Sequence, residues 1–377
     1  MVVHIPTWED SSRVFENPFD TLWWFGERYH KKYGQKWPME GQTPPEGYVY
    51  PSMEGIKLAC VLAVVLTIAR FTFERLIAEP IGRWFGLKHK LGGTPAGPNA
   101  KLEALIMKTK KPTSEQIAAA AKDADMEIRE VEVWIRRKQR ELMPSKLNKF
   151  KETLWRLCVY TFAYTYGMSV LWQEDFFWNT QLCWVGFPDL TWAIKKSLYY
   201  YYLLEGSFYL SLMVSQFMDT KRKDFWEMFI HHIATLSLIG GSWFGGCYKV
   251  GAIVMATHDI SDVFLEAAKT SIYIKKNFWS NIFFGLFTIT FFASRLVYLP
   301  FKVVFCSLVE GSAAVHNWPV HILYNSFLIV LQILHIYWFT FIVKLLIKIA
   351  AGSDVEKDDR SEDDTPPSSS AEEKKQN

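Results

Sequence analysis

Seven apolar runs, each about as long as a helix that crosses a bilayer, constrain the fold of this 377-residue chain more than any other feature. They span residues 55–73, 153–172, 198–217, 225–243, 248–269, 278–305 and 321–349. Backbone groups inside a bilayer must hydrogen-bond within the protein, so single runs of this length predict helices. Mean hydropathy is close to zero only because polar ends and one polar internal stretch dilute these runs. The sequence therefore predicts an all-α integral membrane protein built as a bundle of about seven transmembrane helices.

The placement of Lys and Arg predicts how the bundle is oriented. The segments after the first, third and fifth runs are basic, whereas those after the second and sixth contain no Lys or Arg: the basic ones are 83–151, 221–223 and 269–276, and the others are 173–188 and 307–319. Lys195 and Lys196, at the entrance to the third run, are exceptions. Because cytosolic loops carry the excess of positive charge, the N-terminus is expected outside the cytosol and the C-terminus inside it. The first residues lack a basic segment followed by an apolar one, so the first run is expected to direct the chain to the membrane.

Polar segments divide the rest of the chain. Residues 1–54 are expected to form an irregular non-cytosolic segment, and 55–82 to hold the first transmembrane helix. The basic region 87–145 contains N-cap chemistry at 112–116, then a helix, a turn at 123–125 and a second helix over 126–142, which is a helix-turn-helix in outline. The acidic, serine-rich residues 351–377 predict a disordered tail. The five cysteines lack the paired spacing of a disulfide framework or a zinc site.

Ionisable residues inside two neighbouring apolar runs are the main candidates for chemistry. His231 and His232 lie in the fourth run, and Asp259 and Asp262 lie in the fifth. Such groups cost roughly 2.5–3.5 kcal/mol each at the centre of a membrane helix, so they usually mark function. A turn at Gly245 and Gly246 would place the two pairs at one depth in the cytosolic half. Asp259 and Asp262 are expected on one helix face, which Glu266 extends by a further turn.

This set of side chains allows four interpretations. Imidazole beside carboxylate makes an acid–base pair, in which the carboxylate fixes the tautomer. An imidazole can also be a nucleophile that accepts an acyl group and passes it on. A buried polar network that fixes helix register is the structural alternative. A metal site is disfavoured because adjacent imidazoles diverge by about 100° and no His-x-x-x-His spacing occurs, so no metal is expected.

Basic residues near these runs are candidate substrate-binding groups. Arg295 lies inside the sixth run and could meet a phosphate or a carboxylate, or extend toward an interface. Lys221, Arg222 and Lys223 precede the fourth run. These three are explained most simply by membrane topology, and they also stand where they could contact the phosphates of a cytosolic ligand such as a nucleotide carrier.

The residues around the His and Asp pairs resemble the Lag1 motif of the ceramide synthases, within the TLC-domain family. The matching stretches are 221–235, 251–262 and 265–269, and the resemblance extends from about residue 112 through the seventh run. It implies a TLC-type catalytic domain over 147–350 with His231, His232, Asp259 and Asp262 as essential residues. It further implies N-acylation of a sphingoid base by fatty acyl-CoA in the endoplasmic reticulum membrane. Acyl-CoA is then a cosubstrate, no cofactor is expected, and a homo- or heterodimer is possible.

Region 87–145 resembles the homeodomain-like segment of animal ceramide synthases. Trp134 and the basic helix match, but Arg137 stands where homeodomains carry an adenine-reading Asn, and only 101–108 remains of a first helix. Because two spans tether this region, no nucleic acid is expected as a partner, and contact with anionic lipid or CoA is favoured. The competing functions are a non-catalytic lipid-sensing or translocon-associated TLC protein and a membrane-tethered DNA-binding regulator.

Overall fold

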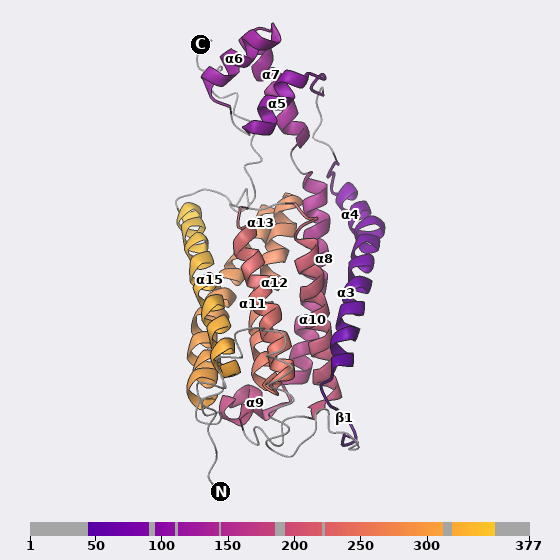
Figure 1. The fold of residues 1–377 in the computed structure, drawn as a ribbon, viewed down its shortest axis with the longest axis vertical. Coiled ribbons are helices and arrows are strands. Elements are labelled where there is room, and N and C mark those ends of the chain that lie inside the picture. The colour runs from indigo at the N-terminus through magenta and orange to yellow at the C-terminus, as the bar shows by residue number, and fades with distance from the viewer. Residues whose placement is uncertain are drawn as a thin grey trace, which may run out of the picture.

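The protein is a bundle of long helices with a smaller three-helix unit at one end (Figure 1). The computed structural model describes residues 44–89, 95–109, 112–142, 145–184, 193–220, 223–311 and 319–350. Nearly all of these residues are helical, which agrees with the predicted fold class.

A helix is present at each of the seven predicted apolar runs. They are α3 (Met53–Phe73), α8 (Lys146–Leu171), α10 (Lys196–Ser215), α11 (Phe225–Phe244), α12 (Tyr248–Tyr273), α13 (Asn277–Phe291) and α15 (Pro319–Ala350). Two of them continue past the predicted bounds through π-helical turns. Helix α3 passes through η2 (Glu74–Ala78) into α4 (Glu79–Trp84), and α13 passes through η4 (Phe292–Val304) to η5 (Cys306–Glu310). Such turns inside helices are frequent at functional sites, and η4 carries Arg295.

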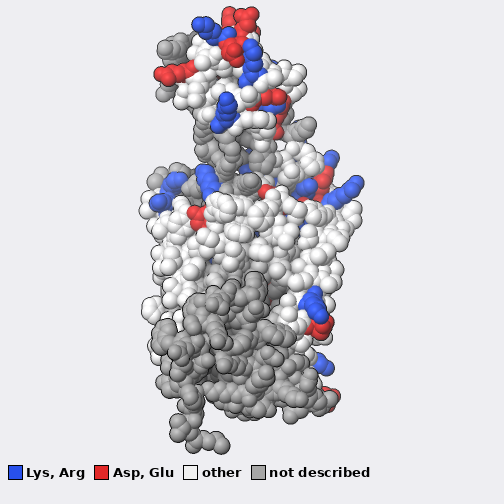
Figure 2. Space-filling view, in the orientation of Figure 1, with Lys and Arg blue, Asp and Glu red and all other residues white. Residues whose placement is uncertain are grey.

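Three helical stretches are long and apolar enough to cross a membrane by length and composition, namely Met53–Trp84, Asn277–Glu310 and His321–Ile349. Helices α8, α10, α11 and α12 carry buried polar side chains, which lower their mean hydropathy. Figure 2 shows charged residues gathered on the three-helix unit and on the adjoining rim of the bundle, while the described bundle wall below is largely uncharged. A largely uncharged wall on this face of the bundle fits a lipid environment. The prediction of an all-α membrane protein is therefore confirmed.

Helix α12 is the centre of the bundle. It packs against α8, α11, α13 and η4, while α10 packs along α3 and α11 packs along α15. Glycines permit some of the closest helix contacts: a Cβ added at Gly167 would lie 2.6 Å from the Tyr201 ring, and one at Gly241 would lie 2.2 Å from the Tyr324 ring. Small residues at such contacts are typical of helices that pack inside a membrane.

The end of the bundle opposite the three-helix unit holds a feature that the sequence did not predict. Strand β1 (Tyr48–Val49) pairs antiparallel with β2 (Ile194–Lys195), so part of the segment expected to be irregular is a short strand. Helix α9 (Asp175–Trp178) and the 3₁₀ turn η3 (Thr180–Cys183) lie at this end too (Figure 1).

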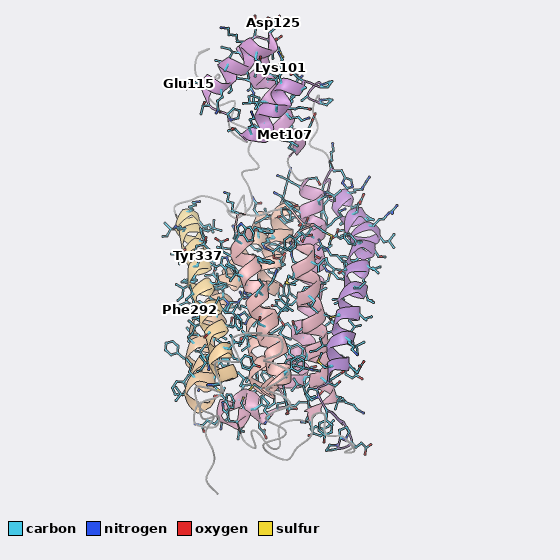
Figure 3. The ribbon with its side chains drawn as sticks, viewed as in Figure 1. Lys101, Met107, Glu115, Asp125, Phe292 and Tyr337 are labelled. Atoms are coloured by element: carbon cyan, nitrogen blue, oxygen red, sulfur yellow. The ribbon has the colours of Figure 1, made fainter. Side chains whose placement is uncertain are left out.

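The three-helix unit has a core of its own. It consists of α5 (Ala100–Lys108), α6 (Ser114–Ala124) and α7 (Ile128–Leu142), which bury Leu102, Val131 and Trp134 between them. Figure 3 labels Lys101, Glu115 and Asp125 on this unit. Helix α6 begins with a capping box and ends two residues later than predicted, because Asp125 takes a left-handed conformation (φ 52°) that closes it. A hydrogen bond between Glu103 and Lys138 joins α5 to α7 and raises the pKa of Lys138.

Candidate active site

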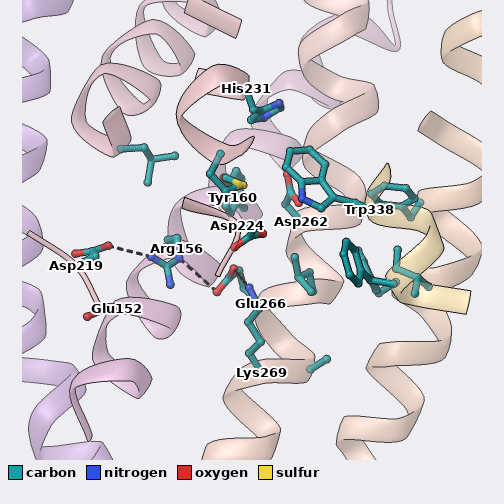
Figure 4. A pocket seen from close by; sticks show the side chains of 18 of the residues that line it. Glu152, Arg156, Tyr160, Asp219, Asp224, His231, Asp262, Glu266, Lys269 and Trp338 are labelled. Carbon is teal, nitrogen blue, oxygen red and sulfur yellow. Dashed lines mark hydrogen bonds and ion pairs between the residues drawn. The ribbon is translucent and has the colours of Figure 1, made fainter. Parts of the chain in front are cut away.

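A cavity of about 200 Å³ lies among α8, α10, α11, α12, α13, η4 and α15, in the part of the bundle nearest the three-helix unit. Both predicted histidines and Asp262 line it, together with apolar side chains such as Trp338 (Figure 4). Other polar or charged residues that line it are Glu152, Arg156, Tyr160, Gln216, Asp219, Thr220, Asp224, Glu266, Lys269 and Arg295. The structure thus brings His231, His232, Asp262, Glu266 and Arg295 of the predicted site residues to one cavity.

His231 and His232 present different environments to this cavity. The Nδ1 atom of His232 lies 2.8 Å from Oε1 of Gln216, whose side-chain amide also donates to the backbone of Phe225. Because an amide oxygen accepts, Nδ1 of His232 carries the proton and Nε2 presents a lone pair. The ring of His231 packs 5.4 Å from Trp338. Among the described residues, its buried Nδ1 atom has no hydrogen-bond partner. One imidazole is therefore oriented, while the other keeps a nitrogen unengaged.

Asp262 forms a buried ion pair with Arg295. The guanidinium donates from Nη2 to Oδ2 of Asp262 at 2.6 Å and to the carbonyl of His258 at 2.8 Å, and it lies 5.0 Å from the centre of the Phe291 ring. The π-helical η4 carries Arg295 inward, and its side chain is only 5% exposed. The predicted intramembrane partner of Arg295 is thus a carboxylate on the neighbouring helix, and the side chain does not extend toward an interface.

Asp259 lies apart from the cavity. Its side chain is fully buried and contacts Glu205 of α10. Among the described residues, the carboxylate oxygens of both groups have no other hydrogen-bond partner. The structure therefore sets Asp259 against α10, and only Asp262 of the predicted pair lines the cavity that holds the two histidines.

Glu266 belongs to a chain of charges along the cavity wall (Figure 4). It pairs with Lys269 at 2.8 Å and with Arg156 at 3.4 Å, and Arg156 in turn pairs with Asp219 at 3.2 Å. Glu266, a predicted substrate-binding residue, is thus already paired with the two cations Arg156 and Lys269.

The basic residues before α11 are only partly described. Lys221 and Arg222 lie outside the described residues, and Lys223 stands just before the start of the helix. Asp224, at the N-terminal end of α11, lines the cavity.

Two histidines that the site prediction left out contact each other near a second cavity, which one of them lines. Nε2 of His258 lies 3.1 Å from Nε2 of His335 in α15, and both rings are buried. His258 lines a narrower cavity of about 50 Å³, which extends toward Trp184 and His321 at the opposite end of the bundle. An ionisable residue inside an apolar run predicted His231 as a candidate site residue. Glu205 and His335 have the same feature in the sequence.

Metal chemistry has no ready site in the described part of the chain. No group of three or more His, Cys, Asp and Glu side chains is placed there to hold a metal ion.

The fold and the cavity define the class of protein: a helical membrane protein with a largely apolar cavity lined by histidines and carboxylates. The TLC-domain family model matches residues 149–344. Human ceramide synthase 5 is 35% identical over 351 residues, which cover 92% of this chain and 88% of that protein. Bovine ceramide synthase 4 is 34% identical and human ceramide synthase 3 is 33% identical, with 84% and 89% of this chain and 80% and 88% of those proteins covered. The chain belongs to the TLC-domain family and, within it, to the ceramide synthases.

Proposed function

We propose that this protein is an N-acyltransferase that transfers a fatty acyl group from acyl-CoA to the amine of a sphingoid base, sphinganine or sphingosine, giving ceramide or dihydroceramide. The observation that carries the proposal is the placement of His231, His232 and Asp262 on the wall of one largely apolar cavity. The names of the curated relatives support the same chemistry.

The cavity suits an amine that carries a long apolar chain. Five acidic residues line it against three basic ones. The acids are Glu152, Asp219, Asp224, Asp262 and Glu266, and the bases are Arg156, Lys269 and Arg295. An excess of negative charge in a space of low dielectric attracts an ammonium group. The apolar wall formed by Phe287, Phe291 and Leu345 then accommodates the hydrocarbon chain.

Two chemical routes use the histidines. In the first, Nε2 of His232 takes a proton from the ammonium or amine, the amine nitrogen attacks the thioester carbonyl, and CoA leaves as a thiol. In the second, an imidazole attacks the thioester first, CoA leaves, and the amine then takes the acyl group from nitrogen. Because Nδ1 of His232 is held by Gln216, the unengaged His231 is the better acyl acceptor and His232 the better base.

The ion pair and the carboxyl pair are proposed to support these histidines. Arg295 holds the Asp262 carboxylate at the cavity wall, where it stabilises an imidazolium that forms nearby. The contact between Asp259 and Glu205 positions α12 against α10. Asp259 therefore supports the site through helix packing and does not line the cavity. Lys221, Arg222 and Lys223 are proposed to meet the phosphates of acyl-CoA at the cytosolic face.

We further propose how the protein sits in its membrane. The seven long helices cross the endoplasmic reticulum membrane, with segment 1–54 in the lumen and tail 351–377 in the cytosol, as the distribution of Lys and Arg favours. Region 55–82 is then the first span and 147–350 the catalytic domain. The three-helix unit within 87–145 is a homeodomain-like region that contacts anionic lipid or CoA rather than nucleic acid. A homo- or heterodimer is compatible with this arrangement.

Acyl transfer by defined variants tests the proposed function. Membranes containing wild type, His231→Ala, His232→Ala or the double variant receive sphinganine and a panel of acyl-CoAs, and N-acylsphinganine is measured by mass spectrometry. We expect each single variant to lose at least about a hundredfold in rate. His89→Ala is the matched control, because the His89 side chain is 44% exposed and lies outside the cavity.

Two outcomes decide between the alternatives. Product that persists in the double variant would exclude catalysis by these histidines, and no product from wild type with any acyl-CoA would favour a non-catalytic lipid sensor. Incubation with acyl-CoA alone separates the two routes. An acyl adduct on His231 or His232 supports the second route, and turnover without any adduct supports the first.

A further inference from the structure

Two buried cysteines meet at the end of the bundle opposite the three-helix unit. Cys183 is the last residue of η3 and Cys306 is the first residue of η5. Their exposed fractions are 5% and 1%. Both are free thiols in the structure, and the residue that follows Cys183 contacts the Sγ atom of Cys306 directly.

The residues around Cys183 fix this juxtaposition. Residues three apart lie on one face of a 3₁₀ turn, so Thr180 and Cys183 point the same way. The Sγ atom of Cys306 lies 3.4 Å from the Thr180 carbonyl and donates to it. Trp184, the next residue after Cys183, donates from Nε1 to the carbonyl oxygen and to Sγ of Cys306, at 3.1 Å in each case. Contacts from residues 180 and 184 therefore hold Cys306 against the turn that presents Cys183.

We infer that Cys183 and Cys306 form a disulfide bond that fastens the segment between α8 and α10 to the end of the long α13–η5 helix. This end of the bundle is lumenal in the orientation proposed above, and disulfides form and persist in that compartment. The rearrangement is small, because the bond replaces only weak thiol hydrogen bonds. Trp184 keeps its hydrogen bond to the Cys306 carbonyl.

The oxidant is the disulfide of a protein thiol–disulfide oxidoreductase. The thiolate of one cysteine attacks that disulfide and forms a mixed disulfide. The second thiolate then displaces the oxidoreductase as a dithiol, so the two cysteines lose two protons and two electrons. Because both thiols are buried in the folded protein, this exchange takes place before Trp184 packs over them.

The bond lies beside the narrower of the two cavities. Trp184 and Ser307, the residues that follow the two cysteines, both line that cavity. A covalent link at this point fixes the distance between two of its walls. Cys247 lies near the same end, so a Cys247–Cys306 bond is the competing pairing. The thiol of Cys247 donates instead to the carbonyl of Gly245 in its own loop.

Thiol counting in the full-length protein tests the inference. Membranes are quenched in acid, free thiols are blocked with N-ethylmaleimide under denaturing conditions, and the protein is then reduced and labelled with a polyethylene glycol maleimide. We expect two labels that depend on reduction in wild type and in Cys247→Ser. We expect none in Cys183→Ser or in Cys306→Ser. Digestion without reduction should yield a peptide pair that joins residues 183 and 306.

A second measurement guards against variants that fold poorly. Reductant should lower the melting temperature of wild type by at least about 3 °C and leave the Cys183→Ala/Cys306→Ala variant unchanged. A wild type without reduction-dependent labels, or labels that survive in Cys183→Ser, would overturn the inference. Ceramide formation by the same membranes reports separately on the proposed function.

Discussion

The buried ion pair between Arg295 and Asp262 makes a quantitative prediction about stability. Replacing Arg295 with Met keeps most of the side-chain length and the contact with Phe291, but it removes the cation and its hydrogen bond to the His258 carbonyl. Removing one partner of a buried pair costs about 3–5 kcal/mol because the other charge stays buried. The Asp262 side chain is 17% exposed and faces the cavity. Water can therefore reach it, and the lower end of the range, about 3 kcal/mol, is expected.

Thermal unfolding of purified protein in detergent, followed by size-exclusion chromatography of the soluble fraction, measures this loss. A cost of this size lowers the melting temperature by at least about 5 °C. Lys302→Met is the matched control, since Lys302 lies exposed on the same π-helical segment and should change stability by less than about 0.5 kcal/mol.

A double variant separates the pair from its surroundings. Asp262→Asn alone leaves Arg295 buried without its carboxylate, so both single changes should destabilise strongly. Combining them removes both charges, and the total loss should fall short of the sum by about 1–3 kcal/mol. Strictly additive losses would refute the ion pair as the reason for the buried arginine.

Two further changes test how α11 is packed and how its histidine is oriented. Gly241→Ala should cost about 2 kcal/mol, because its Cβ would lie 2.2 Å from the Tyr324 ring, whereas Gly240→Ala meets nothing within 4 Å and should gain up to about 1 kcal/mol in helix propensity. Equal melting temperatures for the two alanine variants would contradict this close contact. Gln216→Leu should lower kcat at least about tenfold with little change in KM, because His232 loses the acceptor that fixes its tautomer. Gln216→Glu keeps an acceptor and should keep more activity, and unchanged kcat in the Leu variant would argue against the orienting role.

Hydropathy was sufficient to place the helices of the bundle because membrane helices need long apolar runs. It also predicted that the fourth and fifth runs form a hairpin that brings the His and Asp pairs to similar depth. The division of Asp259 from Asp262 required coordinates. Residues three apart on a helix differ by about 300°, which leaves them 60° apart. That angle is enough for Asp262 to reach the cavity while Asp259 turns toward Glu205 of α10.

Features that depend on a distant partner were beyond sequence reasoning. The pairing of Tyr48 with Lys195 joins two strands of two residues each, and such short segments carry no periodicity. The π-helical turns of η4 also leave no pattern in a run that is apolar all round. Glu205 and His335 were within reach, because each is an ionisable residue in an apolar run. Neither has an ionisable residue next to it in the sequence, whereas His231 and His232 are adjacent and form a stronger motif.

The unit that shapes the cavity is larger than the matched domain. The family model begins at residue 149, yet Arg70 of α3 is buried and pairs with Glu74 at 2.7 Å and with Asp219. Asp219 also holds Arg156, which reaches Glu266 at the cavity wall. In this row of ion pairs, each carboxylate or cation neutralises its neighbours. Removing one of them therefore leaves a neighbouring charge buried without its partner. The first helix therefore contributes to the electrostatics of the site without touching the cavity, and the active protein has to include it.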